Sequence, residues 1–227
     1  MCGSKIISMN EAVSLIKSGS TLMIGGFAGS EAPNEIIQGI VKAGIKDLTL
    51  ICNDTGDLNI PGEHVGILTP NHCIKKAIVS HIGMNKFTVD QFNKGEIEVE
   101  FVPQGTLVER IRAGGFGLGG VLTPTGIGTE IANGKDVINV DGKDYLLEKP
   151  LRADVCIVRA RKADKMGNVI FFGSATSHSA MMTTAAEITI VQTDEIVENG
   201  EIEPNDVKIP GIFIDYIVKG GGDDGIK

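Results

Sequence analysis

Aromatic residues are scarce in this chain, which has no tryptophan and only 4% aromatic residues over 227 positions. A protein so poor in aromatic rings offers few platforms on which nucleic-acid bases can stack. Blocks of basic residues are absent as well, and the formal net charge is -8. Because an acidic surface repels phosphates, we expect no nucleic-acid partner and no anionic membrane partner.

Long apolar runs and metal-binding cysteine patterns are also lacking. No apolar run approaches the roughly 20 residues that cross a bilayer, and Met1–Ser8 lacks the apolar centre of a signal peptide. We therefore expect a cytoplasmic protein. The four cysteines show no CxxC spacing and no histidine pattern of a zinc site, so no metal is predicted. Cys52 and Cys156 lie in apolar runs and are predicted to be buried thiols.

Strand-like and helix-like patterns alternate along most of the chain, which is typical of an α/β fold. The pattern predicts an open parallel or mixed sheet with helices on both faces, in a single domain over residues 1–219 and with a flexible tail over 220–227. Such a chain should bury roughly 70% of its unfolded surface and needs no disulfide. The expected strands are 22–24, 48–52, 77–82, 96–101, 153–159, 169–172, 188–192 and 211–218, and the expected helices are 33–43, 87–93, 107–113 and 179–187.

Two short sequence signals refine this expectation. Val137–Val140 and Lys143–Leu147 flank Asp141-Gly142, a pattern that predicts a β-hairpin projecting near 137–147. Ser8 with Glu11 predicts a capping box at the start of a helix, and Thr106 with Glu109 predicts a second one.

A glycine-rich loop after the first apolar strand is the most distinctive local feature. Gly25, Gly26 and Gly29 permit backbone angles and close approaches that a Cβ forbids, and Pro33 suits the first turn of the following helix. Backbone N–H groups at such a helix start can hold a carbonyl oxygen or an anion. Glu31 already brings negative charge there, so an acyl or thioester ligand fits better than a phosphate. A tight turn without any ligand is the alternative.

Two polar side chains follow strand ends, where ligands bind in open α/β sheets. Asn53 directly follows the strand 48–52, and its alternative role is an Asx turn. Gln104 lies in a strand-to-helix turn, where its amide could face a ligand or simply bond to the backbone. Both remain candidates.

No complete catalytic set is visible in the sequence. Gly115, Gly117 and Gly120 satisfy GxGxxG, but they follow a helix instead of a strand, so we reject a dinucleotide site. GxSxG is absent, the four histidines are scattered, and the acidic residues form no evident dyad. If the chain serves an enzyme, the nucleophile is expected on another polypeptide.

Several motifs follow one another over nearly the whole chain: Gly25-Gly26-Phe27 ahead of Pro33, Pro103–Leu107, Glu109–Gly115, Leu122–Gly126, Ala163–Asn168 and Pro210–Ile212. Taken in this order, they resemble the A (alpha) subunit of family I CoA-transferases, of the acetate/butyrate–acetoacetate type. The resemblance implies a CoA-transferase-like fold shared with ribose-5-phosphate isomerases. It also implies a separate B subunit and a cytoplasmic heteromer such as α2β2.

The resemblance further implies a division of chemistry between the two subunits. A glutamate of the B subunit attacks the acyl-CoA thioester and comes to hold CoA as a glutamyl thioester, which a second carboxylate then discharges. This chain would contribute no catalytic residue. Its segment from Gly25 to Glu31 (Gly25, Gly26, Phe27, Ala28, Gly29, Ser30 and Glu31) would bind CoA, while Gln104, with Asn53, would face the carboxylate substrate. CoA and short-chain acyl-CoA are then substrates, and no cofactor is bound permanently.

The sequence differs from the family pattern at two places and contains one misleading motif. Glu31 replaces the glycine usual in the family, and Thr176–Ala180 replaces an Arg/Asn-Phe-Asn-Pro stretch. Glu198-Asn199-Gly200 mimics the motif around the B-subunit nucleophile, but it follows a late strand and is expected to be a turn.

Two other functions stay open at this point. A non-enzymatic small-ligand sensor of the same fold would need a DNA-binding appendage or a basic face, whereas this chain is acidic. A self-contained isomerase or hydrolase would need an acid/base pair within the chain.

Overall fold

The computed structural model describes residues 4–60, 62, 64–173, 176 and 178–220. Cys2, Ser177 and all but the first residue of the expected tail over 220–227 lie outside the described residues. The helices are α1 (Met9–Leu15), α2 (Asn34–Lys42), α3 (Lys86–Asn93), α4 (Gln104–Gly115) and α5 (Ser179–Met182). Short 3₁₀ turns are η1 (Val65–Ile67), η2 (Glu130–Ala132), η3 (Pro204–Asp206) and η4 (Gly211–Phe213).

The main sheet is open and almost entirely parallel, as predicted. Its strands are β1 (Thr21–Ile24), β2 (Leu48–Ile51), β3 (Ile74–Val79), β4 (Glu98–Phe101), β8 (Ala153–Asp164), β9 (Val169–Ile170), β10 (Ala186–Val197) and β11 (Tyr216–Lys219). They lie in the order β11-β10-β8-β1-β2-β3-β4, and β9 pairs antiparallel with β8. At the centre, Met23 of β1 is in register with Cys156 of β8 and with Ile51 of β2. Strands buried on both faces read as apolar runs, which is why the sequence predicted them.

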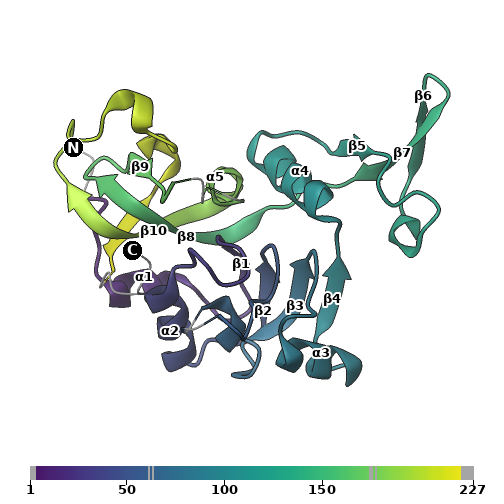
Figure 1. Ribbon diagram of the computed structural model, residues 1–227, viewed down its shortest axis with the longest axis horizontal. Helices are drawn as coiled ribbons and strands as arrows, with labels where there is room; N and C mark the ends of the chain where they lie inside the picture. The colour runs from purple at the N-terminus through teal and green to yellow at the C-terminus, as the bar shows by residue number, and fades with distance from the viewer. Residues whose placement is uncertain (1–3, 61, 63, 174–175, 177, 221–227) are drawn as a thin grey trace.

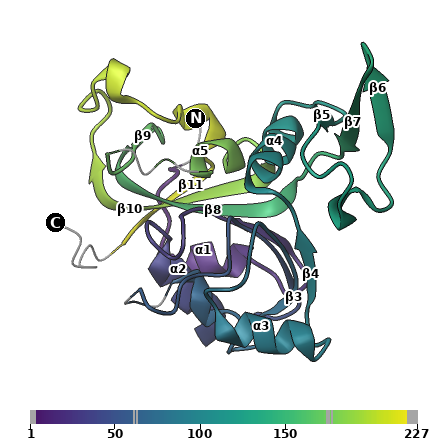
Figure 2. The ribbon, with the colours of Figure 1, turned by 45° about the vertical axis from the view of Figure 1, so that its right-hand side comes forward.

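Helices cover both faces of the main sheet. Helices α1 and α2 pack on one face, where Ile36, Ile37 and Ile40 are buried. Helices α4 and α5 cover the other face with Leu107, Ile111 and Met182. Figure 2 shows these two layers on opposite sides of the sheet. None of the helices in the described residues is long and apolar enough to span a bilayer.

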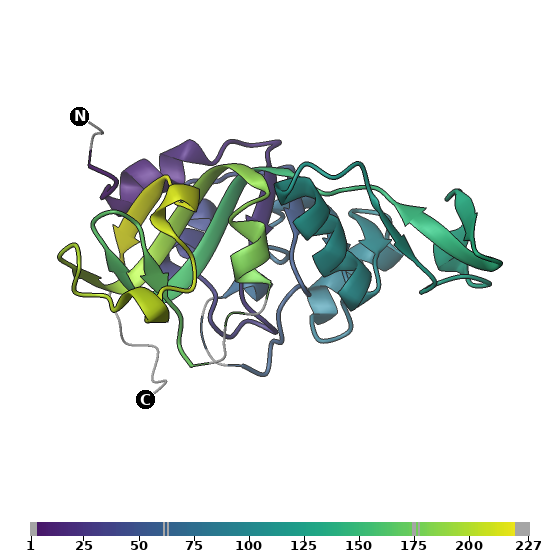
Figure 3. The same cartoon turned by 90° about the horizontal axis from the view of Figure 1, so that it is seen from above.

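The hairpin prediction is confirmed, and the hairpin belongs to a second, smaller sheet. Strands β5 (Val121–Thr123), β6 (Val137–Val140) and β7 (Lys143–Glu148) form an antiparallel sheet in the order β5-β7-β6. Asp141 and Gly142 both have positive φ, at 51° and 81°, as a two-residue hairpin turn requires. Figures 1 and 3 show this sheet reaching away from the main sheet at one end of the molecule.

A group of charged side chains fastens the small sheet to the main one. Glu148, at the end of β7, is buried and accepts a bond from Lys135 Nζ at 2.5 Å. Arg110 of α4 lies 3.8 Å from the same carboxylate and donates to Glu100 of β4 at 2.7 Å. Because one arginine joins carboxylates from both sheets, the base of the small sheet is fixed relative to α4.

Several predicted elements differ from the structure. The expected strand 77–82 is shifted by three residues, since β3 spans Ile74–Val79. The expected strand 211–218 is wrong in its first half, because 211–213 form η4 and β11 begins only at Tyr216. The expected helix 179–187 stops at Met182, since β10 begins at Ala186 to pair with the long strand β8. The capping box at Thr106 is also wrong. Helix α4 begins at Gln104, behind Pro103 and three residues before the expected start at 107, and Thr106 Oγ1 has no hydrogen-bond partner. The capping box of Ser8 and Glu11 is confirmed.

Replacing Gly114 with alanine should destabilise the protein strongly. A Cβ on Gly114 would lie 1.9 Å from the carbonyl oxygen of Leu151, where α4 packs against the chain leading into β8. We expect Gly114→Ala to lower the free energy of unfolding by about 1–3 kcal/mol or more, measured by urea denaturation. Gly105→Ala, on the same helix with open space around it, is the matched control and should be neutral or stabilising by up to about 1 kcal/mol. Equal effects of the two changes would contradict this packing.

Candidate functional site

Two loops meet at the carboxyl edge of the central strands. The glycine loop follows β1, and residues 52–56 follow β2, which is its parallel neighbour in the sheet. Adjacent parallel strands deliver their following loops to the same edge, where ligands bind in open α/β sheets. The backbone N–H of Asp57 donates to the carbonyl of Ala28 at 3.0 Å, which ties the two loops together directly.

A buried carboxylate that the sequence analysis did not single out holds this junction. Asp54 is 3% exposed, and its Oδ2 accepts hydrogen bonds from Ala28 N at 2.8 Å and from Asn53 Nδ2 at 2.6 Å. Its Oδ1 accepts from Gly56 N at 2.7 Å. A buried charge is stable only when it is well hydrogen-bonded, so these contacts fix the position of both loops. The sequence feature that could have identified Asp54 is its position: it is an acidic residue that directly follows Asn53 at the end of a strand.

Gln104 joins the same network. It is the first residue of α4, it is exposed, and its Nε2 donates to Asn53 Oδ1 at 2.6 Å. The glycine loop, Asn53 and Gln104 were nominated separately from the sequence. The structure brings all three together in one chain of hydrogen bonds that runs through Asp54.

Each glycine of the loop has a packing reason. A Cβ on Gly25 would lie 2.4 Å from Ser179 Oγ, and one on Gly29 would lie 2.5 Å from the ring of His64. Gly26 has φ +104°, and its Cβ would meet the carbonyl oxygen of Ser30 at 2.6 Å. Glycine is therefore required here by the fold itself, whether or not a ligand binds.

The loop also contains residues in an unfavourable backbone region. Ala28 and Glu31 have φ of 54° and 55°, which side chains other than glycine rarely adopt. Such strain persists only where neighbouring contacts enforce it. At Ala28 the enforcing contact is the bond from its N–H to Asp54, and Phe27 beside it is 49% exposed.

The starts of the two nearest helices differ electrostatically. In α2 the N–H of Ile36 is bonded to Gln192 Oε1 at 3.2 Å, and Glu35 lies in the first turn. In α4 the N-cap Pro103 supplies no side-chain bond, and the first turn contains no acidic residue. The start of α4, next to Gln104, is therefore the better place for a ligand carboxylate.

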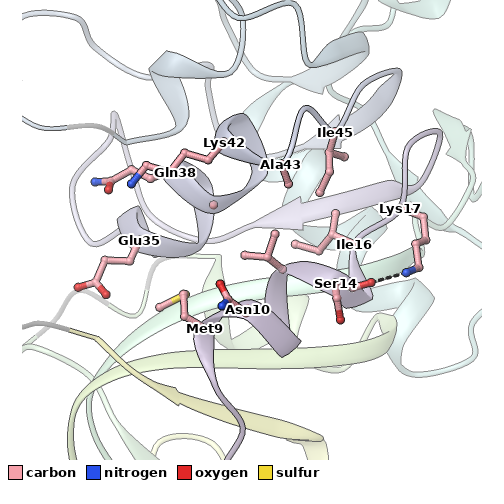
Figure 4. A pocket seen from close by; sticks show the side chains of 12 residues that line it. Met9, Asn10, Ser14, Ile16, Lys17, Glu35, Gln38, Lys42, Ala43 and Ile45 are labelled. Carbon is pink, nitrogen blue, oxygen red and sulfur yellow. Dashed lines mark hydrogen bonds between the residues drawn. The ribbon is translucent and has the colours of Figure 1, made fainter.

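Little space is enclosed at the junction by the described residues. The cavity under the glycine loop, lined also by Asn53 and Asp54, has a volume of about 10 Å³, which is about one water. A groove of about 340 Å³ lies beside Gln104, between Gly105–Glu109 of α4 and Val121–Thr125. A larger groove of about 780 Å³ lies between α1 and α2, but none of its lining residues belongs to the candidate site (Figure 4). We place the site at the carboxyl edge because the polar network is there.

Three other side chains with reactive groups, Glu198, His64 and Cys52, do not serve as reacting groups at this site. Glu198 is exposed at the turn after β10 and pairs with Lys165. His64 is buried, and its Nδ1 accepts from Gly66 N at 3.1 Å, so it caps η1. Burial raises the pKa of the Cys52 thiol well above its ordinary value, so it is a poor nucleophile. Across the described ranges, no three acidic, histidine or cysteine side chains gather in a way that could hold a metal ion.

Comparison with known proteins gives strong matches over almost the full length. Residues 6–220 match the family described as Coenzyme A transferase. The acetate CoA-transferase subunit alpha of Escherichia coli K12 is 43% identical over 215 residues, which are 95% of this chain and 96% of that protein. The acetoacetyl-CoA:acetate/butyrate CoA transferase alpha subunit of Clostridium acetobutylicum is 44% identical, over 95% of this chain and 98% of that protein.

Solved structures share the fold at lower sequence identity. The acyl-CoA transferase of Escherichia coli O157:H7, in a thioester complex with CoA, superposes with a TM-score of 0.84 at 21% identity. That match covers 98% of this chain and 48% of the other, so this chain spans about half of it. Glutaconate coenzyme A-transferase from Acidaminococcus fermentans gives a TM-score of 0.84 at 22% identity, covering 96% of this chain and 76% of the other.

Removing the charge of Asp54 should loosen both loops. We expect Asp54→Asn to destabilise the protein by about 1.5–3 kcal/mol, because an amide cannot accept from three donors as the carboxylate does. Amide hydrogen exchange should speed up at Ala28 and Gly56, which donate to that carboxylate. The control is Asp57→Asn in the same loop, where the carboxylate bonds to Asn59. Unchanged exchange at Ala28 in Asp54→Asn would contradict the role of Asp54.

Stability should also fall with mild acid through His178. Burial lowers the pKa of His178 below its ordinary value of 6.5, and the charge of Asp54 opposes part of that shift. The unfolded chain therefore takes up this proton more readily, and the free energy of unfolding decreases as the pH falls below about 6.5. Urea unfolding at about pH 7.5 and about pH 5.5 measures the effect. His178→Gln should lose part of this pH dependence, and an unaltered dependence would refute the assignment.

Proposed function

The chain belongs to the coenzyme A transferase family, and from that premise we propose that it is the A subunit of a heteromeric, cytoplasmic CoA-transferase. The enzyme would move CoA between a short-chain acyl-CoA and a carboxylate such as acetate, butyrate or acetoacetate. CoA and acyl-CoA act as substrates, and no cofactor is held permanently. The subunit would work as one domain over residues 1–219, without nucleic-acid or membrane partners.

Two similarities support a two-subunit enzyme. The full-length relatives are named as alpha subunits of CoA-transferases that act on acetate, acetoacetate or butyrate. The acyl-CoA transferase that shares the fold is about twice as long as this chain. A second chain of similar size, the B subunit, would supply what that longer chain carries in its other half.

The polar network at the carboxyl edge is the observation that carries the proposal. One chain of hydrogen bonds fixes Gln104, Asn53 and the glycine loop in one place. The described residues around that network enclose only about 10 Å³. A fixed polar surface without an enclosing wall fits a site that a second polypeptide completes.

We assign the acceptor carboxylate to Gln104. Its amide is exposed at the start of α4, and the first turn of that helix contains no acidic residue. A carboxylate there would gain both an amide donor and the positive end of the helix dipole. Asn53 would act by orienting Gln104, because its Oδ1 accepts the Gln104 amide at 2.6 Å.

We assign CoA binding to the segment from Gly25 to Glu31. Ala28 and Gly29 adopt the left-handed backbone there, and Phe27 beside them is 49% exposed at the edge where the two loops meet. The nucleophile would be a glutamate of the B subunit, which attacks the acyl-CoA thioester carbonyl and forms a glutamyl–acyl anhydride as CoA leaves. The CoA thiolate then attacks the glutamyl carbonyl and releases the first acid. The acceptor carboxylate reverses these steps and leaves as the new acyl-CoA.

The sensor alternative has less support. The relatives that match over the full length are named as enzymes, and no observation on this chain favours a regulatory role.

Transfer activity should require the B subunit and depend on Gln104. We expect no acetyl-CoA:butyrate transfer by this chain alone and activity when the B subunit is added. Gln104→Ala should lower kcat/KM for the carboxylate about 10- to 100-fold, the cost of one lost hydrogen bond to a charged group. Gln38→Ala, on the exposed side of α2 by the groove of Figure 4, is the control. Full activity of the isolated chain, or an unaffected Gln104→Ala enzyme, would contradict the proposal.

A further inference from the structure

The small sheet β5-β7-β6 exposes an unusual amount of apolar surface. Several large apolar side chains at least 39% exposed lie between residues 116 and 140. They are Phe116, Leu118, Leu122, Ile127, Val137, Ile138 and Val140. We call this segment, residues 116–148, the arm. Exposed apolar side chains gathered on a projecting element are typical of a surface that binds another polypeptide.

Strand β6 is the least protected part of the arm. It pairs with β7 on one side and is the outermost strand of its sheet, so its other edge has unpaired backbone groups. All its residues, Val137-Ile138-Asn139-Val140, are exposed, and none is charged. Protein edge strands are usually guarded by lysine, proline or a bulge, and β6 has none of these. A strand of this kind is a ready template for pairing with another chain.

The arm cannot support itself through its own core. In β6 and β7, Leu146 and Glu148 are the buried residues. A three-stranded sheet with so small a core is marginal in water. A polar contact ties its base to helix α4, because Arg110 lies 3.8 Å from the buried Glu148 carboxylate, which also pairs with Lys135 inside the arm. The arm is thus held rigidly at its base while its apolar surface has no cover within the described chain.

The position of the arm indicates which partner covers it. Helix α4 carries Gln104 at its start and leads into the arm at its end. The groove of about 340 Å³ between α4 and β5 is lined by Gly105, which directly follows Gln104, and by Val121, Leu122 and Thr123 of the arm. A chain that docks on the arm can therefore extend along this groove to Gln104.

A second copy of this chain fits the arm less well. β6 lies at the outer edge of the arm, at one end of the long axis of the molecule (Figure 3). Two copies paired edge to edge through β6 would hold their main sheets apart. Such a pair would leave the groove beside Gln104 without an occupant.

We propose that the arm is the docking surface for the companion B subunit, which adds a strand to the free edge of β6 and covers the apolar side chains around it. This rests on the proposed function. Docking by strand addition supplies main-chain hydrogen bonds, and the apolar side chains supply affinity. Contact through the arm and its groove would place the partner over Gln104.

The test measures the affinity between this chain and a B-type CoA-transferase chain. The test variant is Val137→Thr/Ile138→Thr/Val140→Thr, which keeps β-branched side chains and removes apolar contact. The control is Met166→Thr/Ile212→Thr, which changes side chains 59% and 86% exposed near Gly211, outside the arm. We expect the arm variant to weaken binding by about 30-fold or more, and the control to bind within about twofold of wild type. Sedimentation velocity measures both.

Two further readouts separate docking from other effects. The free arm variant should show the thermal midpoint of wild type, since its side chains are already exposed, and its kcat should recover when the B chain is saturating. Unchanged affinity, or loss only of self-association, would overturn the proposal. If wild type binds and is activated while the arm variant binds equally well, only the docking surface is wrong. If wild type does not bind the B chain at all, the proposed function fails as well.

Discussion

The buried carboxylate of Asp54 is the constraint on which the rest of the candidate site depends. It gathers two backbone N–H groups and one side-chain amide from the loops that follow β1 and β2. Those bonds hold Ala28 in a left-handed conformation and, through Asn53, set the position of Gln104. A buried charge without these donors would be costly, and the donors without the charge would leave loops free to move. The carboxylate and the loop geometry therefore stabilise each other.

This arrangement explains how an A subunit can serve catalysis without a reacting group of its own. Its rigid parts are the glycine loop, where each glycine is required by a close neighbour, and the start of α4, which is open and free of acidic residues. We propose that both surfaces bind and orient the substrates. The groove from Gln104 toward β5, and the apolar arm beyond it, extend that surface toward a partner. On this proposal, substrate positioning lies in this chain and the attacking group lies in the B subunit.

Much of the fold was predictable because burial leaves a clear pattern. The run Leu48–Cys52 and the pair Asp141-Gly142 were interpreted correctly, since a central parallel strand and a two-residue hairpin turn allow few other sequences. Thr106 was misread because Pro103 starts the helix earlier than the capping pattern suggests. Residues 211–213 have the composition of a strand but form the 3₁₀ turn η4, because tertiary contacts override the local preference. The glycine loop, Asn53 and Gln104 could be nominated singly, but Asp54, which joins them, could be recognised only once the two loops were seen side by side.

The central claim is that this chain forms one side of a reaction site and that the nucleophile belongs to the B subunit. The direct measurement is mass spectrometry of the mixed subunits after reaction with acyl-CoA, with the CoA thioester trapped by borohydride or hydroxylamine. The account predicts that the modified residue is a glutamate of the B subunit and that no residue of this chain is modified. A thioester adduct on any residue of this chain would contradict it.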